Sequence, residues 1–193
     1  MLRCVRMAKT KALKTSATYE DLRAVPEHFV AEILGGELYA TPRPPLPHAH
    51  AASVLGVELG GPFHRGRGGP GGWWILDEPE LHFGADVLVP DLAAWRRERL
   101  PAIPAALYLT LAPDWICEVL SPSTETIDRA KKLAIYAREH IRCAWLVNPS
   151  SQTLEVLRLE AERWTLLATH EGEAKVRAEP FDAIELELGA LWT

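Results

Sequence analysis

The sequence predicts an α/β (α+β) fold in which helices flank a mixed β-sheet. Short apolar runs recur along the 193 residues. A helical pattern over residues 124–140 separates two of these runs, as in a crossover between parallel strands. Alternating polar and apolar residues near each end of the chain predict an N-terminal β-hairpin and a C-terminal β-hairpin extension of the sheet.

The first elements are a short helix and a hairpin. Thr18 is a suitable N-cap for a helix over residues 18–25, because acidic residues occupy the turn that follows it. Next, residues 29–34 and 37–41 are predicted to pair across a two-glycine turn that tolerates positive φ.

The register of this hairpin follows from its two-residue turn. Glu32 is expected to face Tyr39, and Leu34 to face Glu37. Glu32 and Glu37 therefore share one face of the hairpin. Such faces are commonly polar and exposed, so an ordinary solvated face remains an alternative to a functional one.

The rest of the chain alternates between strands and helices. Apolar residues have helical spacing over residues 48–59, and the glycine-rich stretch 60–72 is predicted to be a loop. Predicted strands cover residues 73–76, 81–83, 86–94, 115–120 and 143–147. The C-terminal hairpin is expected over residues 153–160 and 164–170. No internal repeat or second domain is apparent.

Composition indicates a globular protein. Hydrophobic residues make up 48% of the chain, and no window approaches the roughly 20 apolar residues of a membrane span. No secretory signal is recognisable, so we expect a cytoplasmic protein without membrane partners. Cys4, Cys117 and Cys143 are too widely spaced to indicate a zinc site or a disulfide framework.

Charge is distributed unevenly along the chain. The net charge is −5, which argues against a strongly basic nucleic-acid-binding protein. Residues 1–14 nevertheless contain five lysines or arginines and no acidic residue. We therefore expect a flexible basic arm over residues 1–15 and a single folded domain over residues 16–193.

Two acidic residues interrupt apolar runs. Asp91 lies within the predicted strand 86–94, and Glu118 lies within the predicted strand 115–120. A carboxylate in a buried strand is costly unless it is paired or binds a metal. Carboxylates from neighbouring strands can converge on one Mg²⁺ ion, and Mn²⁺ suits the same oxygen ligands. With lysines on the next helix, this arrangement indicates a cation site for phosphodiester chemistry.

These residues resemble a known family. In order and spacing they are similar to the Uma-type (Uma-two) restriction endonuclease family of the PD-(D/E)XK nuclease superfamily. The resemblance covers most of residues 18–150. The segments that carry it are Ala31–Leu38, His48, Asp86–Leu92, Glu118–Ser123 and the helix with Asp128, Lys132, Leu133, Tyr136 and Ala137.

The resemblance implies a restriction-endonuclease-like fold and assigns roles to individual residues. Asp91 and Glu118 would be metal ligands, and the carbonyl of Val119 a further ligand. The superfamily lysine is expected two residues after Glu118, but Leu120 occupies that position. In Uma-type proteins the following helix supplies the lysine instead, which points to Lys132 as the third catalytic residue.

Helical periodicity favours a different lysine. A core stripe of Ile127, Ala130, Ala134, Ala137 and Ile141 would place Lys131 at its edge and Lys132 nearly opposite. Lys131 therefore remains the rival of Lys132. Both could also simply solvate the helix.

Three further residues are accessory candidates. Glu32 and Glu37 would approach the same metal or bind a water that positions the substrate. His48, just ahead of the first long helix, would carry protons at the cleft or only cap the helix.

The predicted function is metal-dependent hydrolysis of phosphodiester bonds in nucleic acid, with DNA as the expected substrate. Asp91 and Glu118 would hold Mg²⁺ or Mn²⁺, and Lys132 would stabilise negative charge. The displaced lysine and acidic net charge favour one alternative, a non-catalytic module for binding or assembly. A hydrolase of smaller phosphate esters is another. A homodimer is plausible, because enzymes that cut both strands often use two-fold symmetry.

Overall fold

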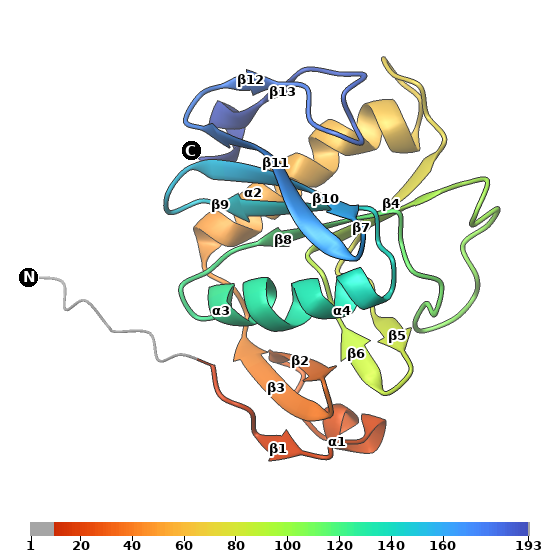
Figure 1. The fold of residues 1–193 in the computed structure, drawn as a ribbon, viewed down its shortest axis with the longest axis vertical. Coiled ribbons are helices and arrows are strands. Elements are labelled where there is room, and N and C mark those ends of the chain that lie inside the picture. Colours follow the sequence, from red (N-terminus) through yellow and green to blue (C-terminus); the bar gives the residue numbers. More distant parts are fainter. Residues whose placement is uncertain (1–9, 193) are drawn as a thin grey trace, which may run out of the picture.

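A computed structural model describes residues 10–192 and contains two main β-sheets, one above the other in Figure 1. The six-stranded sheet has the order β11-β10-β9-β8-β7-β4, and the five-stranded sheet has the order β1-β3-β2-β6-β5. A small third sheet pairs β12 with β13. No helix within the described residues combines the length and apolar character needed to cross a membrane.

The six-stranded sheet contains β4 (Trp73–Asp77), β7 (Leu92–Arg96), β8 (Trp115–Val119), β9 (Cys143–Asn148), β10 (Thr153–Glu160) and β11 (Arg163–Glu171). Strands β8 and β9 are parallel, and the other pairs are antiparallel. The parallel pair is the one joined through a helix, and the C-terminal hairpin β10–β11 extends the sheet as predicted.

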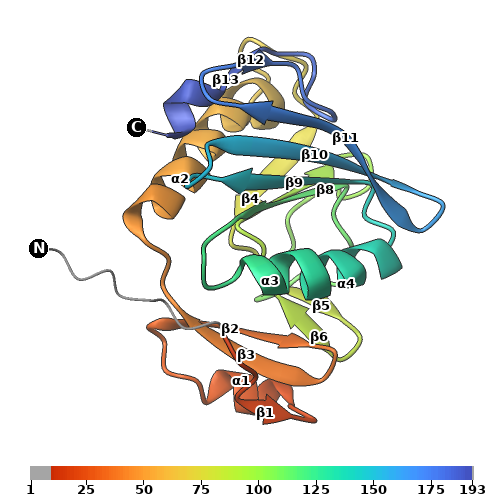
Figure 2. The same ribbon diagram turned by 60° about the vertical axis from the view of Figure 1, so that its left-hand side comes forward.

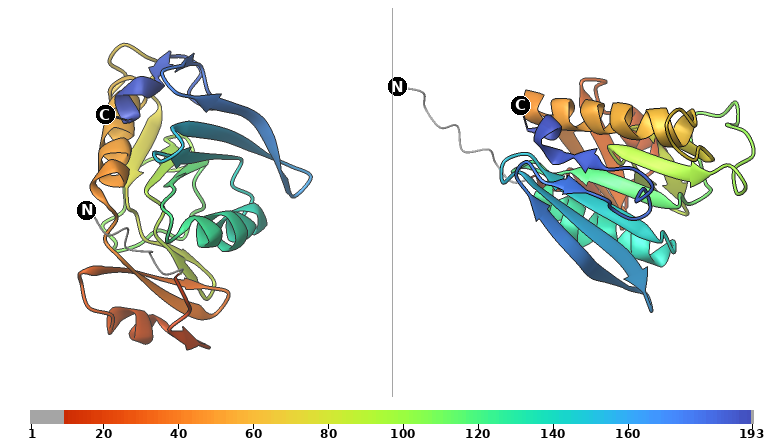
Figure 3. Two further views of the ribbon diagram at one scale, coloured as in Figure 1. Left: turned by 90° about the vertical axis from the view of Figure 1, so that its left-hand side faces the viewer. Right: turned by 90° about the horizontal axis from the view of Figure 1, so that it is seen from above.

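Different elements cover the two faces of this sheet, as Figure 3 shows. Helix α2 (Leu46–Leu59) packs on one face, together with the C-terminal elements β12 (Lys175–Val176), β13 (Leu186–Glu187) and η3 (Leu188–Leu191). The helical segment after β8 packs on the other face, which also adjoins the five-stranded sheet (Figure 2). Both faces are therefore buried, and the central strands are apolar on both sides.

The five-stranded sheet is built on the predicted N-terminal hairpin. Its strands are β1 (Lys14–Thr15), β2 (Phe29–Leu34), β3 (Glu37–Pro42), β5 (Leu81–Phe83) and β6 (Asp86–Leu88), with α1 (Tyr19–Arg23) packed beside them. Glu32 pairs with Tyr39 and Leu34 with Glu37, so the predicted register is confirmed. Residues 1–9 of the predicted arm, including Cys4, lie outside the described residues.

One predicted strand is in fact two. The apolar pattern predicts a single strand over residues 86–94, but β6 ends at Leu88 and β7 begins at Leu92, each in a different sheet. Pro90 lies in the break, and proline has no N–H to donate to a strand ladder. Asp91 therefore lies in the link between the two sheets rather than within a strand.

The long predicted helix contains a wider turn. Helix α3 (Glu125–Ile127) continues into the π-helical turn η2 (Asp128–Lys132) and then into α4 (Leu133–Arg138). The predicted core stripe is only partly right: Ile127 and Ile141 are buried, but Ala130 and Ala134 are exposed, and Leu133 and Tyr136 are buried instead. A π turn adds one residue to the repeat, which rotates the side chains that follow it. The predicted loop 60–72 likewise begins with a π-helical turn, η1 (Gly60–His64).

Candidate active site

A cavity of about 310 Å³ lies where the chain passes between the two sheets. Its wall brings together residues far apart in sequence. It contains most of the predicted site residues: Glu32, His48, Asp91, Glu118, Val119 and Lys132. Glu37 is absent from this wall.

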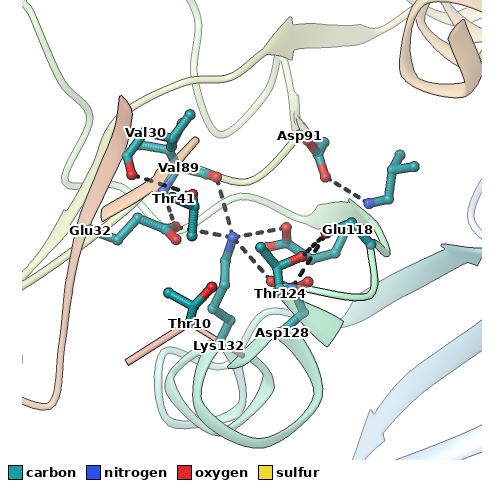
Figure 4. A network of polar contacts seen from close by, with 12 residues as sticks. Thr10, Val30, Glu32, Thr41, Val89, Asp91, Glu118, Thr124, Asp128 and Lys132 are labelled. Carbon is teal, nitrogen blue, oxygen red and sulfur yellow. Dashed lines mark hydrogen bonds and ion pairs between the residues drawn. The ribbon is translucent and has the colours of Figure 1, made fainter. Parts of the chain in front are cut away.

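Lys132 is the centre of the polar network in Figure 4. Its Nζ atom lies 2.8 Å from Glu118 Oε2 and 3.0 Å from Glu32 Oε1. It also donates to the carbonyl of Val89 at 3.3 Å. An ammonium group has three N–H donors: two of them are hydrogen-bonded to Glu118 and Val89, and Glu32 is paired with the ammonium as an ion. Only 3% of Lys132 is exposed, and these three contacts hold its side chain in place.

Glu118 projects from β8 toward the same helix. It faces away from the α2 side because its neighbours Cys117 and Val119 occupy that core. Its Oε1 atom accepts a hydrogen bond of 2.6 Å from the hydroxyl of Tyr136, one helical turn beyond Lys132. Burial raises the pKa of Glu118 well above its usual range, although Lys132 opposes that effect.

Asp91 follows Pro90 in the link between the sheets. Its Oδ2 atom accepts a 2.7 Å hydrogen bond from the backbone N–H of Val119, which fixes Asp91 beside the end of β8. Its Oδ1 atom lies 3.3 Å from Nε2 of His48. His48 is in the first turn of α2 and is buried, and its Nδ1 atom has no partner among the described residues. His48 therefore lines the cavity beside Asp91.

Glu32 connects the five-stranded sheet to the helix. Its Oε1 atom accepts a 2.8 Å hydrogen bond from the backbone N–H of Val89 and also contacts Lys132. Through these contacts one carboxylate orients both the lysine and the segment that leads to Asp91.

Asp128 belongs to the helix that carries the family resemblance, but the sequence assigns it no role in the site. It lines the cavity, is 4% exposed, and lies 3.7 Å from Lys132. Burial is the main reason that its pKa is raised to about 6, and Lys132 partly opposes the rise. Its place in the first turn suggests only a favourable interaction with the helix dipole. The spacing of four residues between Asp128 and Lys132 is the one local signal of their contact.

Lys131 and Glu37 form a separate, more exposed pair. Lys131 Nζ donates to Glu37 Oε2 at 2.8 Å, and the hydroxyl of Tyr39 donates to the same oxygen at 2.6 Å. The periodicity argument for Lys131 is therefore not supported, because the π turn directs Lys132 inward instead. The expectation that Glu37 shares a site with Glu32 is also wrong, since Lys131 and Tyr39 bind it outside the cavity.

The cavity carries a large excess of acid. Five carboxylates line it, from Glu32, Glu78, Asp91, Glu118 and Asp128, and its only cationic side chains among the described residues are Arg43 and Lys132. When all are ionised, the wall has a charge of about −3, before any contribution from His48. Such a wall attracts cations and repels phosphate.

The donor set fits a hard divalent cation. Mg²⁺ prefers oxygen ligands and is usually bound by one or two carboxylates, with water and substrate phosphates completing its shell. Asp91 and Glu118 supply such oxygens to one cavity, and Val119 lines it beside them. Within residues 10–192, no three His, Cys, Asp or Glu side chains are grouped so as to hold a metal by themselves.

Comparisons with known proteins give a family and a fold. A profile of the Uma2 family, described as "Putative restriction endonuclease", matches residues 17–189. No curated protein matches the chain. The fold is similar to the crystal structure of a "putative nuclease belonging to DUF820" from Anabaena variabilis ATCC 29413, with a TM-score of 0.72 and 22% identity. That match covers 91% of this chain and 97% of the other, and the predicted fold class is confirmed.

Proposed function

The chain belongs to the Uma2 family, and we propose from this membership and from its acidic cavity that it is a metal-dependent endonuclease acting on DNA. One observation carries the proposal. Lys132 is buried against Glu118 and Glu32 in the cavity that Asp91 also lines, so the lysine and the two predicted metal ligands meet at one place. This arrangement supports phosphodiester hydrolysis.

Asp91 and Glu118 would hold Mg²⁺ or Mn²⁺, with the Val119 carbonyl as a further ligand. Such an ion supplies a Lewis acid that polarises a phosphate and lowers the pKa of bound water. The N–H of Val119 orients Asp91, while Tyr136 and Lys132 orient Glu118. These contacts fix both carboxylates before any ligand enters, which reduces the reorganisation needed on binding.

Lys132 and His48 would act beside the two carboxylates. The ammonium group of Lys132 places positive charge in the cavity wall, where it stabilises negative charge that develops on a phosphate. The nearby carboxylates outweigh the effect of burial and hold the pKa of Lys132 well above its usual range, so it remains protonated. His48 Nε2, beside Asp91, can hold or release a proton at that atom.

The test is nicking of supercoiled plasmid by the purified protein with Mg²⁺ or Mn²⁺. Asp91→Asn and Glu118→Gln keep side-chain size and remove the charges, so we expect each to reduce the rate at least 100-fold and to weaken metal binding in calorimetry. Glu37→Gln is the matched control, because Glu37 lies outside the cavity, and it should cut like the wild type. EDTA should abolish cutting. Cutting that survives in both site variants would refute the assignment.

One observation favours a second candidate, a non-catalytic binding or assembly module. Leu120 occupies the usual lysine position, and the Lys132 ammonium is already engaged by Glu118, Glu32 and Val89. A protein that neither cuts nucleic acid nor binds Mg²⁺ or Mn²⁺ in calorimetry would fit this module. Metal binding together with hydrolysis of mononucleotides, but not of plasmid, would instead indicate a phosphate-ester hydrolase.

A further inference from the structure

Arg43 is the cavity cation that remains accessible to a ligand. The other one, Lys132, is buried and bound to Glu118, Glu32 and Val89. The side chain of Arg43 is 65% exposed and lines the same cavity. Its contact with Glu78 is long, at 4.0 Å, and Glu78 is itself 48% exposed. Such an exposed pair is weak and easily exchanged for another partner.

The backbone around Arg43 is restricted. Its neighbours are Pro42, Pro44 and Pro45, whose rings fix φ. A residue before proline is itself confined to extended conformations, so Pro44 limits Arg43 as well. The backbone of Arg43 is thus stiff where its side chain lines the cavity, and less backbone entropy is lost when the guanidinium binds a ligand.

A phosphodiester that approaches this cavity meets an excess of negative charge. A divalent ion would remove only part of that excess, so a strand of nucleic acid needs further positive contacts near the site. Guanidinium groups bind phosphate in a bidentate manner and are suited to this role. Among the described cations that line the cavity, only Arg43 is free to provide it.

We propose that Arg43 binds a backbone phosphate of the substrate strand, and that Glu78 is the partner which this phosphate displaces. The proposal rests on the endonuclease function proposed above. It implies that the two rim residues act in opposite directions. Removing the charge of Arg43 weakens nucleic-acid binding, whereas removing the charge of Glu78 frees Arg43 and reduces repulsion, and so strengthens binding.

The experiment measures binding of a fluorescein-labelled 20-base-pair DNA duplex by anisotropy, in EDTA to prevent metal-dependent cutting, at several salt concentrations. We expect Arg43→Gln to weaken binding about tenfold and to lower the slope of log K against log salt by about 1. Glu78→Gln should tighten binding about twofold. Arg163→Gln is the matched control, because Arg163 is exposed on β11 and does not line the cavity.

Two further measurements complete the test. With Mg²⁺ present, Arg43→Gln should raise KM and leave kcat nearly unchanged, because a phosphate beside the scissile bond is held equally before and during the reaction. If the wild type binds the duplex and Arg43→Gln binds it as tightly as Arg163→Gln does, the role of Arg43 is refuted and the endonuclease proposal is not affected. Wild-type protein that neither binds nor cuts DNA would overturn the endonuclease proposal and this one together.

Discussion

Replacing Lys132 by methionine should strongly destabilise the fold. Its ammonium lies 2.8 Å, 3.0 Å and 3.7 Å from the carboxylates of Glu118, Glu32 and Asp128, whose side chains are all at most 10% exposed. Removing one partner of a buried ion pair leaves unpaired charge and costs about 3–5 kcal/mol. For a chain of this size that loss lowers Tm by roughly 10 °C. Lys131→Met breaks only an exposed pair and should cost about 1 kcal/mol or less.

Urea unfolding followed by tryptophan fluorescence measures both values, since Trp115 and Trp145 are fully buried. The loss caused by Lys132→Met should be smaller at pH 5 than at pH 8, because the unpaired carboxyls can then take up protons. Adding Glu118→Gln should restore part of the lost stability, because it removes one of the unpaired charges. Equal free energies of unfolding for Lys132→Met and Lys131→Met would refute the view that Lys132 is the buried counter-ion of this cluster.

Two further substitutions probe the same cluster. Asp128 has its pKa raised to about 6 from 3.8, so the folded protein binds more protons than the unfolded chain between these values, and stability from this group is lost as pH rises. The free energy of unfolding of Asp128→Asn should therefore rise relative to that of the wild type by about 2 kcal/mol between pH 4 and pH 7 in urea titrations; a difference independent of pH would contradict this. Tyr136→Phe leaves Glu118 Oε1 without its buried donor and should cost about 1–3 kcal/mol in the same assay. Tyr19→Phe is a milder control, because the hydroxyl of Tyr19 donates to the partly exposed Glu80. Equal losses for the two tyrosines would argue against the special role of Tyr136.

Residues whose signal is local can be predicted from the sequence. The two-glycine turn sets the hairpin register, so the sequence alone places Glu32 opposite Tyr39. An acid inside an apolar run stands out without knowledge of its neighbours, which is why Asp91 and Glu118 are recognisable as candidates. The alternation of the C-terminal hairpin is a local signal of the same kind.

Features that depend on tertiary structure are not predictable in this way. The π turn changes the helical repeat without a sequence signature, so periodicity points to Lys131 and conceals the inward direction of Lys132. Tyr136 has an ordinary helical position, and only the fold brings its hydroxyl to Glu118. Asp128 lies four residues before Lys132, but its burial also depends on the fold. Arg43 cannot be identified from the sequence either, because its proximity to Glu78 arises from two loops that are distant along the chain.

The link at Val89, Pro90 and Asp91 connects the two sheets, and the cavity lies at this connection. Glu32 comes from one sheet and Glu118 from the other, and Lys132 connects them. Any local opening that separates the sheets therefore dismantles the site before either sheet unfolds. Conversely, a ligand that enters the cavity ties the two halves together. Amide hydrogen exchange in β2 and in β8 should then slow in parallel, so that ligand binding at the site is detectable in both sheets.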